Sequence, residues 1–530
     1  MRHLNSATGF PAAITLVFSL AALTGCGGGG GGNNPPPTSG WTAGMFPPRA
    51  NFEAKCATPR SGIDPTTGQP YLDRQGTATD ENNWLRSWTN DFYLWYREVP
   101  DQNPANFATA AYFGVLKTSA TTASGQPKDK FHFTYATSDW IALSQSGSQL
   151  GYGAQWVILS GTPPRQLVIA YTDPGSPAAV APANLARGAQ VLFIDGVDLV
   201  DDNTQAGVDT LNAGIAPATV GEVHQFVVQD AGAAGTRNVS LTSANVVSVP
   251  VQNVGTIDTG SAGLVGYILF NDHIATAESQ LIDAVTTLKN AGISDLVLDI
   301  RYNGGGYLDI ASEMAYMIAG PAHTAGQTFE ELQFNDKYPT TNPIAGGPLT
   351  PTTFHATAQG FSAPAGQALP TLNLPRVYVL SGTGTCSASE SIINSLRGVG
   401  VDVIEVGSTT CGKPYGFYPD DNCGTTYFSI EFRGVNAAGF GDYSDGFSPQ
   451  NSAGTVGALI PGCSVADDFS KPLGDPTEGR LASALFYRAN ANCPTGPTGA
   501  AGPAKPVGSL AASDGTLIRP PWRENRILRR

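Results

Sequence analysis

Hydrophobic and polar positions change their spacing along the chain, and these changes divide it into segments. Between 81 and 140, apolar residues recur every three or four positions, as on one face of a helix. Between about 150 and 250 the pattern becomes short β-rich runs separated by Gly and Pro turns. From about 260 to 490, strand-like and helix-like runs alternate, which is typical of a parallel sheet with helical crossovers. We therefore expect a multidomain protein of the α/β class.

The individual elements follow from the same pattern. In the first segment, a stripe of large apolar residues at helical spacing predicts a helical module that buries them in its core. They are Trp84, Leu85, Trp88, Phe92, Leu94 and Trp95. Strands of the β domain are expected at 156–159, 167–171, 191–194, 225–228 and 239–241. The α/β unit is expected to contain strands at 264–270, 295–300, 377–380 and 401–406, helices at 275–291, 308–319 and through Ile392, Ile393 and Leu396, and a closing segment at 473–487.

The N-terminus has the pattern of an export signal. Arg2 precedes an apolar stretch at 14–23, and the stretch ends in Leu23-Thr24-Gly25-Cys26, which resembles the bacterial lipobox. We expect cleavage before Cys26, lipidation of Cys26, and a Gly-, Asn- and Pro-rich tether after it. A plain secretory signal is the alternative. Gly27 gives no retention signal of the Asp type, which favours the outer membrane of the cell envelope.

Charge and cysteine content narrow the class of protein. The net charge is -14, with no basic run outside the last few residues, so the chain has no footprint for a nucleic-acid partner. Six cysteines remain after Cys26, an even number in a compartment that permits disulfides. Cys411 and Cys423 are the closest pair in sequence and can clip a loop, but the sequence leaves the pairing open.

The expected domain organisation combines these observations. After 493 the composition turns to Pro, Gly, Ala and Ser and ends in a short basic run, for which we expect disorder. The boundaries are a signal peptide at 1–25, a tether at 26–55, a helical module at 56–147, a β domain at 148–252, an α/β unit at 253–493 and a tail at 494–530.

A candidate nucleophile follows one of the expected α/β strands. Ser387 lies between the strand at 377–380 and the next helix, where α/β sheets place their sites and where a helix N-terminus stabilises negative charge. Ser387 and Glu390 also fit a Ser-x-x-Glu capping box, which is a structural interpretation of the same residues. On this motif alone, capping is favoured.

A lysine changes that balance. Lys413 follows the next strand, at the same end of the sheet, in the segment 407–413. A buried lysine can take the proton of a serine hydroxyl, because burial disfavours the ammonium form. No histidine lies in either motif, so a Ser-Lys pair is favoured over a Ser-His-Asp triad.

These motifs together resemble those of the tail-specific, or C-terminal processing, serine peptidases. The matching segments are Cys386-Ser387-Ala388-Ser389-Glu390, Cys411-Gly412-Lys413, and a strand followed by a Gly-rich turn, Leu298-Asp299-Ile300-Arg301-Tyr302-Asn303-Gly304-Gly305-Gly306. The resemblance implies that Ser387 is the nucleophile, Lys413 its general base, and the amides of Gly305 and Ala388 the oxyanion hole. It also implies a crotonase-like peptidase core.

The β domain resembles a PDZ domain, which binds peptide C-termini by adding a strand to a sheet edge. Leu150-Gly151-Tyr152-Gly153 matches the carboxylate-binding loop, Pro174 to Ala178 precedes an expected short helix, and Ile194-Asp195-Gly196 ends a strand. The resemblance implies that Leu150, Gly151, Tyr152 and Gly153 hold the end of a peptide. The partners are then proteins or peptides with exposed C-termini.

Three departures from the peptidase pattern leave alternatives open. Phe417 stands where the family usually has a Gln that orients the lysine, and Pro414 and Cys386 also differ. An inactive peptide-binding lipoprotein is therefore one alternative, and an esterase is another, although no Gly-x-Ser-x-Gly elbow surrounds Ser387. Metal-ligand spacings and a phosphate-binding Gly-x-x-x-x-Gly-Lys-Ser/Thr motif are missing, so we expect no metal and no cofactor.

Overall fold

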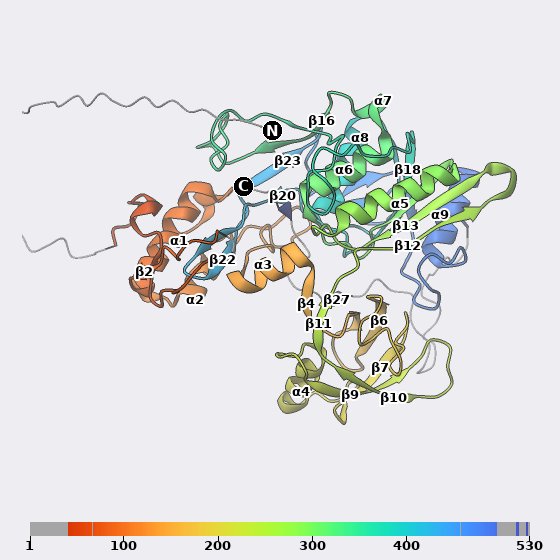
Figure 1. Ribbon diagram of the computed structural model, residues 1–530, viewed down its shortest axis with the longest axis horizontal. Helices are drawn as coiled ribbons and strands as arrows, with labels where there is room; N and C mark the ends of the chain where they lie inside the picture. Colours follow the sequence, from red (N-terminus) through yellow and green to blue (C-terminus); the bar gives the residue numbers. More distant parts are fainter. Residues whose placement is uncertain (1–40, 66, 456, 496–515, 519–525, 528–530) are drawn as a thin grey trace, which may run out of the picture. The chain divides into compact units, whose positions relative to one another are not determined.

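A mixed six-stranded sheet forms the centre of the α/β unit (Figure 1). The computed structural model describes residues 41–65, 67–455, 457–495, 516–518 and 526–527. The strand order is β12-β13-β14-β18-β19-β26, with β12 antiparallel to β13 and the others parallel. These strands are β12 (Val251–Asp258), β13 (Leu264–Phe270), β14 (Asp295–Asp299), β18 (Arg376–Ser381), β19 (Asp402–Gly407) and β26 (Gly462–Ser464).

Alternating side chains of this sheet feed two separate cores, because successive residues of a strand point to opposite faces. Ile268, Phe270 and Leu298 belong to a core covered by α5 (Ala277–Ala291), α6 (Leu308–Ala319) and α8 (Ala388–Gly398). Tyr267 and Leu269 belong to a core on the other face, to which α9 (Gly479–Asn490) contributes. The strands and helices expected in this unit are confirmed, although α9 begins six residues later than the expected closing segment.

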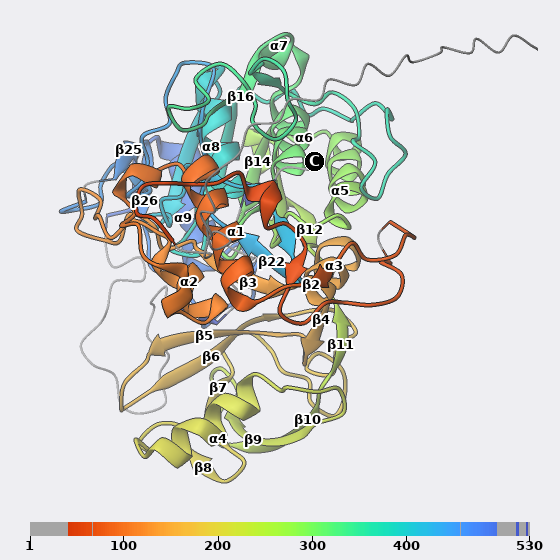
Figure 2. The same ribbon diagram turned by 90° about the vertical axis from the view of Figure 1, so that its left-hand side faces the viewer.

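The β domain is an antiparallel sheet with one helix (Figure 2). Its strand order is β10-β9-β7-β6-β5-β27, and β8 pairs with β7. The five expected strands are confirmed as β5 (Ala154–Ser160), β6 (Gln166–Thr172), β7 (Gln190–Ile194), β9 (Val223–Gln229) and β10 (Arg237–Thr242), joined by β4 (Ser148–Gly151), β8 (Val197–Asp198), α4 (Gln205–Ile215) and β11 (Ala244–Val247). The short helix expected after Pro174 is wrong: turns occupy that segment.

The N-terminal region is built around α1 (Ala78–Phe92), as the aromatic stripe predicts. Thr77 caps this helix in a capping box with Asp80, and Trp84, Leu85, Trp88 and Phe92 are buried in one cluster with Tyr427 of the α/β unit. The other elements are η1 (Arg49–Asn51), β1 (Lys55–Cys56), β2 (Arg74–Gln75), η2 (Tyr96–Glu98), η3 (Pro104–Asn106), α2 (Thr109–Val115), β3 (Phe133–Ala136) and α3 (Thr137–Ser146).

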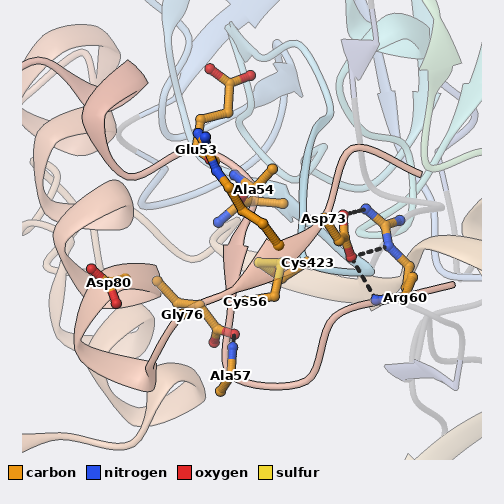
Figure 3. Close-up of a disulfide and its surroundings, with 12 residues drawn as sticks. Glu53, Ala54, Cys56, Ala57, Arg60, Asp73, Gly76, Asp80 and Cys423 are labelled. Carbon is orange, nitrogen blue, oxygen red and sulfur yellow. Dashed lines mark hydrogen bonds and ion pairs between the residues drawn. A yellow bond between two sulfur atoms is a disulfide. The ribbon is translucent and has the colours of Figure 1, made fainter. Parts of the chain in front are cut away.

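Strand β3 shows that this region is not an independent helical module. It pairs with β22 (Thr425–Phe428), which pairs with β21 (Asp420–Asn422), in a three-stranded sheet. The disulfide Cys56–Cys423 ties the two segments together, beside the Arg60–Asp73 ion pair (Figure 3). The two parts are therefore linked both by strand pairing and covalently.

Short helices and strands complete the α/β unit. They are η4 (Gly260–Ala262), β15 (Gly306–Tyr307), α7 (Pro321–Thr324), β16 (Thr328–Gln333), β17 (Thr352–Thr353), β20 (Tyr415–Gly416), β23 (Phe432–Val435), β24 (Phe447–Pro449) and β25 (Ala458–Ile460). Among the described residues, no helix combines the length and the apolar character needed to cross a bilayer. The signal, the lipidation site Cys26 and the first half of the expected tether, 26–40, lie outside the described residues. The second half is not a tether, because it contains η1 and the start of β1.

The disulfide pairing, which the sequence left open, is Cys56–Cys423, Cys386–Cys411 and Cys463–Cys493 among the described residues. The tail contains two strands where we expected disorder, β27 (Thr516–Ile518) and β28 (Arg526–Ile527), because the open edges of β5 and β15 offer backbone partners.

Candidate active site

Ser387 lies at a tight turn between β18 and α8. Its backbone has φ 61°, a left-handed conformation that non-glycine residues seldom adopt and that persists only where surrounding contacts impose it. The side chain is fully buried, and Oγ has no hydrogen-bond partner among the described residues. The hydroxyl is thus held by its backbone and left without a competing acceptor.

Lys413 reaches the same place from the neighbouring strand. Ser381 at the end of β18 is paired with Gly407 at the end of β19, and the chain continues from Gly407 to Lys413 without regular structure. Lys413 is fully buried. Parallel strands end at one edge of a sheet, so the nucleophile turn and the lysine loop meet there, as the sequence predicts.

One carboxylate joins the two segments. Glu390 Oε2 accepts the backbone N–H groups of Ser387 and Lys413, each at 2.8 Å. Glu390 Oε1 accepts the N–H of Gly412 at 2.8 Å and the hydroxyl of Thr410 at 2.5 Å. Burial raises the pKa of Glu390, whereas the hydrogen bonds from Thr410, Lys413, Ser387 and Gly412 lower it. Glu390 therefore does more than cap α8: it fixes the dyad's two backbones on one group.

A disulfide makes a second connection. Cys386 precedes Ser387 directly and is bonded to Cys411, with Cα atoms 5.2 Å apart. The N–H of Cys411 also donates to the carbonyl of Thr385 at 3.0 Å. The two sulfurs and Glu390 lie close together. Since the sulfurs are joined to each other, neither is a thiolate nucleophile or a thiolate metal ligand.

The amino group of Lys413 lies against two aromatic rings. Its Nζ is 4.5 Å from the centre of the Phe131 ring and 4.7 Å from that of Phe417. Such contacts attract a cation through the negative face of the ring. Phe417 stands where the family usually has a Gln that would hydrogen-bond the lysine. Its side chain is fully buried, and its ring faces the amino group. Phe131 comes from the N-terminal region, so that region forms part of the site.

Asn303 organises the Gly-rich turn and connects it to the nucleophile. Its Oδ1 accepts the N–H of Gly305 at 2.9 Å and lies 2.9 Å from Nδ1 of His273. Its backbone carbonyl accepts the N–H of Cys386 at 3.0 Å and the hydroxyl of Ser389 at 2.9 Å. The expected support of the turn by Ser389 has a physical basis in this bond.

The two amides predicted to form the oxyanion hole differ in whether another group already accepts their hydrogen. The Gly305 amide is occupied by Asn303 Oδ1, so it is not free to receive an oxyanion in this conformation. Ala388, the first residue of α8, is buried directly after the nucleophile. The sequence missed Asn303 as the residue that holds the turn; its position inside a matched motif was the available signal.

A buried ionic cluster supports the turn from below. Arg301 contacts Asp299 at 2.9 Å, Asp467 at 2.7 Å and Glu478 at 2.8 Å, and all four side chains are almost fully buried. Arg187 of the β domain also contacts Asp467, at 2.6 Å. The arginines hold the pKa of Asp467 well below its usual range despite the burial that would raise it. The cluster ties the strand before the Gly-rich turn to the start of α9 and to the β domain.

No histidine among the described residues forms a hydrogen bond with Ser387 Oγ. His273 is fully buried beside the Gly-rich turn, and burial lowers its pKa to about 3. His132 contacts the carbonyl of Phe113, and burial lowers its pKa to about 4. Both imidazoles are neutral at physiological pH. The preference for lysine over histidine in the sequence analysis stays consistent with these positions.

The loop 150–153 lines a cavity of about 340 Å³ together with the start of β5 and the end of α4. Leu150 and Gly151 belong to β4, which pairs with β11. Gly153 has φ 73°, and a Cβ there would lie 2.2 Å from Cβ of Ser176, so only glycine fits. Tyr152 is buried and donates its hydroxyl to the carbonyl of Gly214 at 3.0 Å, so its side chain supports the loop.

Comparisons with known proteins agree on the α/β unit. Residues 264–416 match the sequence profile of Peptidase family S41. A carboxyl-terminal-processing protease from Picosynechococcus sp. is 28% identical over 181 residues, which is 33% of this chain and 40% of that protein. A chloroplastic C-terminal processing peptidase from Tetradesmus obliquus is 30% identical over 185 residues, 33% of this chain and 38% of that one. The alignments span about two fifths of these relatives.

One solved structure extends the similarity over more of the fold. A protein from Bacteroides fragilis described as an S41 protease aligns with a TM-score of 0.56 and 23% identity, over 77% of this chain and 97% of its own. At this identity the match establishes the fold alone. Residues 264–416, which include Gly305, Ser387 and Lys413, thus match Peptidase family S41, and the two relatives that align with this chain are C-terminal processing peptidases.

Proposed function

We propose that this protein is a serine endopeptidase of the tail-specific type, with Ser387 as nucleophile and Lys413 as general base. The observation that carries this proposal is the Glu390 carboxylate, which receives the amides of both residues on one oxygen. The burial of both side chains at one edge of the sheet supports it, although Ser387 Oγ makes no hydrogen bond to Lys413 Nζ in this conformation. The family of the α/β unit makes peptide hydrolysis the expected chemistry.

The proposed reaction proceeds in two halves. Ser387 Oγ bonds to the carbonyl carbon of the substrate, and its proton passes to Lys413 Nζ. The resulting ammonium gives that proton to the leaving amine as the peptide bond breaks. Water then attacks the acyl-Ser387 ester and gives a proton to Lys413, which passes it to Ser387 Oγ as the ester bond breaks and the acid product leaves. Lys413 is buried, and its Nζ faces the rings of Phe131 and Phe417.

Stabilisation of the oxyanion is assigned to the amides of Ala388 and Gly305. The helix N-terminus at Ala388 favours developing negative charge. Gly305 can contribute after the Asn303 side chain turns away, or by sharing its N–H between two acceptors. Binding of the substrate chain along the Gly-rich turn is the step to which we assign this change.

The β domain is proposed to act as a PDZ domain that captures an exposed, apolar C-terminus. Support comes from the cavity beside 150–153, which β5 and α4 also line. A peptide strand would add to β5, and the loop amides would hold the terminal carboxylate. Substrates are then exported or misfolded proteins with accessible chain ends.

Degradation of an unfolded protein with an apolar C-terminus tests the peptidase proposal. Ser387→Ala and Lys413→Ala are expected to reduce kcat at least about 10³-fold, as removal of a nucleophile or its base does. Ser395→Ala is the matched control, because this serine lies on α8 but donates only to the carbonyl of Ser391. Equal rates in Ser387→Ala and the unmutated protein would refute the assignment.

A binding protein without catalytic activity is the second candidate. The engagement of the Gly305 amide by Asn303 favours it, because this conformation lacks one oxyanion donor. Binding of a peptide C-terminus without any cleavage by the unmutated protein would establish this alternative. Ester hydrolysis without peptide hydrolysis would instead indicate an esterase.

We also propose that Cys26 carries a lipid that anchors the protein in the cell envelope, with the outer membrane favoured. The support is the segment Leu23-Thr24-Gly25-Cys26 and the tether after it. Incorporation of labelled palmitate that disappears in Cys26→Ser would support lipidation. Release of the unmutated protein as a lipid-free secreted form would contradict it.

A further inference from the structure

The two loops that carry the dyad have no regular structure of their own. One runs from the end of β18 to Ser387, and the other from the end of β19 to Lys413. A displacement of about 1 Å in a catalytic group can cost on the order of 10²-fold in rate, so these loops need fixed positions. Ser387 adds to this need, because its left-handed backbone must be imposed by its neighbours.

We propose that the Cys386–Cys411 disulfide is a positioning element of the Ser387–Lys413 dyad, and that opening it lowers turnover while leaving peptide binding intact. This inference rests on the proposed peptidase function. The disulfide joins the residue before the nucleophile to the lysine loop, so it limits how far the two loops can separate. Glu390 holds the same loops through hydrogen bonds that can open and close, whereas the covalent bond cannot.

The other two disulfides provide an internal comparison. Cys56–Cys423 joins the N-terminal region to the β21–β22 hairpin, and Cys463–Cys493 joins β26 to the chain after α9. Neither includes a residue adjacent to Ser387 or Lys413. Loss of Cys463–Cys493 should therefore lower stability without a specific effect on turnover.

The experiment compares Cys386→Ala/Cys411→Ala with the matched variant Cys463→Ala/Cys493→Ala. We expect kcat to fall at least about tenfold in the first, with KM and peptide affinity within twofold, and kcat to stay within twofold in the second. Hydrogen exchange adds a readout that needs no activity: the amides of Gly412 and Lys413 should lose protection only in the first variant. Unchanged protection, or equal loss of kcat in both variants, would overturn the inference.

Chemical reduction of the Cys386–Cys411 disulfide tests the same inference without a substitution. A dithiol reductant transfers two electrons and two protons to the sulfurs and becomes a cyclic disulfide itself. Cys411 is only partly buried, so the bond is open to attack from its side. Activity of the unmutated protein should fall on reduction and return on reoxidation, while Cys386→Ala/Cys411→Ala should not respond. If the oxidised unmutated protein cleaves no peptide, the proposed function fails. Hydrogen exchange at Gly412 and Lys413 then still shows whether the disulfide fixes the lysine loop.

A second inference comes from the strand pairings of the C-terminal segment. Strand β27 pairs antiparallel with β5, Thr516 with Ile158 and Ile518 with Trp156, so the segment runs toward the loop 150–153. Strand β28 pairs in parallel with β15, directly after Gly305, and contacts β20, close behind Lys413. Strand β27 thus occupies the edge of β5 to which a captured peptide would add. Strand β28 lies at the Gly-rich turn along which a substrate would pass.

We infer that strands β27 and β28 are intramolecular ligands of these two edges and compete with peptide substrates. It follows from the pairings that a substrate strand can add to β5 only after β27 leaves, because a strand edge pairs with one neighbour at a time. Removal of the segment should therefore strengthen peptide binding without improving the chemical step. The inference rests on the proposed capture of peptides by β5.

The test uses Leu517→Pro, which removes one backbone donor from β27, with Ala511→Pro, which precedes Thr516 by five positions in the sequence, as the matched control. On a Ser387→Ala background, affinity for a fluorescent peptide with an apolar C-terminus should rise at least about fivefold in Leu517→Pro and in a chain ending at Gly515. A synthetic peptide of residues 509–530 should compete with the fluorescent one for the shortened chain. Equal affinity in the full and shortened chains would overturn the inference, whereas peptide binding by neither would refute the capture function itself.

Discussion

The proposed dyad and the proposed peptide edge of the β domain are built in opposite ways. Ser387 and Lys413 are fully buried on loops tied together by Glu390 and by a disulfide, and Asn303 joins the Ser387 loop to the Gly-rich turn through Cys386. The proposed peptide edge is the backbone of β5 beside a loop that depends on Gly153, and β27 pairs with it through the backbone. The Ser387–Lys413 site therefore depends on specific cross-links between distant segments, and the edge depends on backbone geometry.

The largest effect should come from Glu390→Gln. An amide can accept hydrogen bonds through only one of its two terminal atoms, so at least two of the four donors now on Glu390 would lose their acceptor. Each unpaired buried donor costs about 1–3 kcal/mol. We expect kcat to fall at least about 10²-fold, measured by peptide cleavage, with lower thermal stability.

Glu278→Gln is the matched control for that variant. Glu278 is also buried and accepts the amides of Gln359, Gly360, Ser362 and Ala363, but it lies at the start of α5, away from the dyad. It should lose a similar amount of stability and retain kcat within about threefold. Equal loss of kcat in both variants would remove the special role of Glu390.

The next largest effect is expected on peptide binding at the loop 150–153. Gly153→Ala places a Cβ against Ser176 and forces a residue with φ 73° out of its glycine-favoured conformation, so the loop 150–153 must shift. Peptide affinity should fall about tenfold or more by fluorescence anisotropy, while hydrolysis of a short ester substrate stays unchanged. Gly161→Ala, where the nearest atom lies 3.8 Å away, is the control. Loss of ester hydrolysis in Gly153→Ala would show that the two sites are not separable.

A smaller effect is expected at the ring that faces the lysine. Phe417→Leu keeps the position apolar but removes the aromatic face 4.7 Å from Lys413 Nζ. Because that face favours the ammonium, its loss should move the acidic limb of the pH–kcat profile to lower pH and reduce kcat a few-fold. Phe428→Leu, in the same cluster, should leave the profile in place. An unchanged profile in Phe417→Leu would exclude a role of the ring in tuning Lys413.

The smallest effect on activity is expected at Glu405, which should instead affect how the free energy of unfolding depends on pH. Burial raises the pKa of this carboxyl on β19 to about 8, and its Oε1 accepts the hydroxyl of Ser381. A folded-state pKa above the unfolded value means that the folded state holds the proton longer. Stability should therefore fall by about 1.4 kcal/mol per pH unit as pH rises from about 4.5 to 8.

Glu405→Gln removes this proton while keeping the shape and an acceptor for Ser381. Relative to the unmutated protein, the variant should gain thermal stability as pH rises through that range, with kcat within twofold. Thermal unfolding at several pH values measures the difference. A stability difference that is constant with pH would show that Glu405 is ionised in the folded protein.

Several features of the site were predictable because they depend on local order in the chain. A serine and a lysine at the ends of two neighbouring parallel strands must approach each other, so the spacing of the strands was sufficient to pair Ser387 with Lys413. The helices α1, α5, α6 and α8 follow from apolar periodicity for the same reason. Gly305 was correctly placed near the nucleophile turn, but its engagement by Asn303 depends on a rotamer that no local pattern specifies.

The sequence by itself determined the parallel α/β order, the aromatic face of α1, and the meeting of the Gly-rich turn, Ser387 and Lys413 at one sheet edge. The tertiary structure alone decided that Cys386 pairs with Cys411, that Glu390 serves both loops, that Phe131 reaches Lys413 from the N-terminal region, and that β27 covers β5. Periodicity is a property of neighbouring residues and survives in the linear chain. Contacts between segments far apart in sequence depend on how the folded chain returns on itself, and many pairings satisfy the same local pattern.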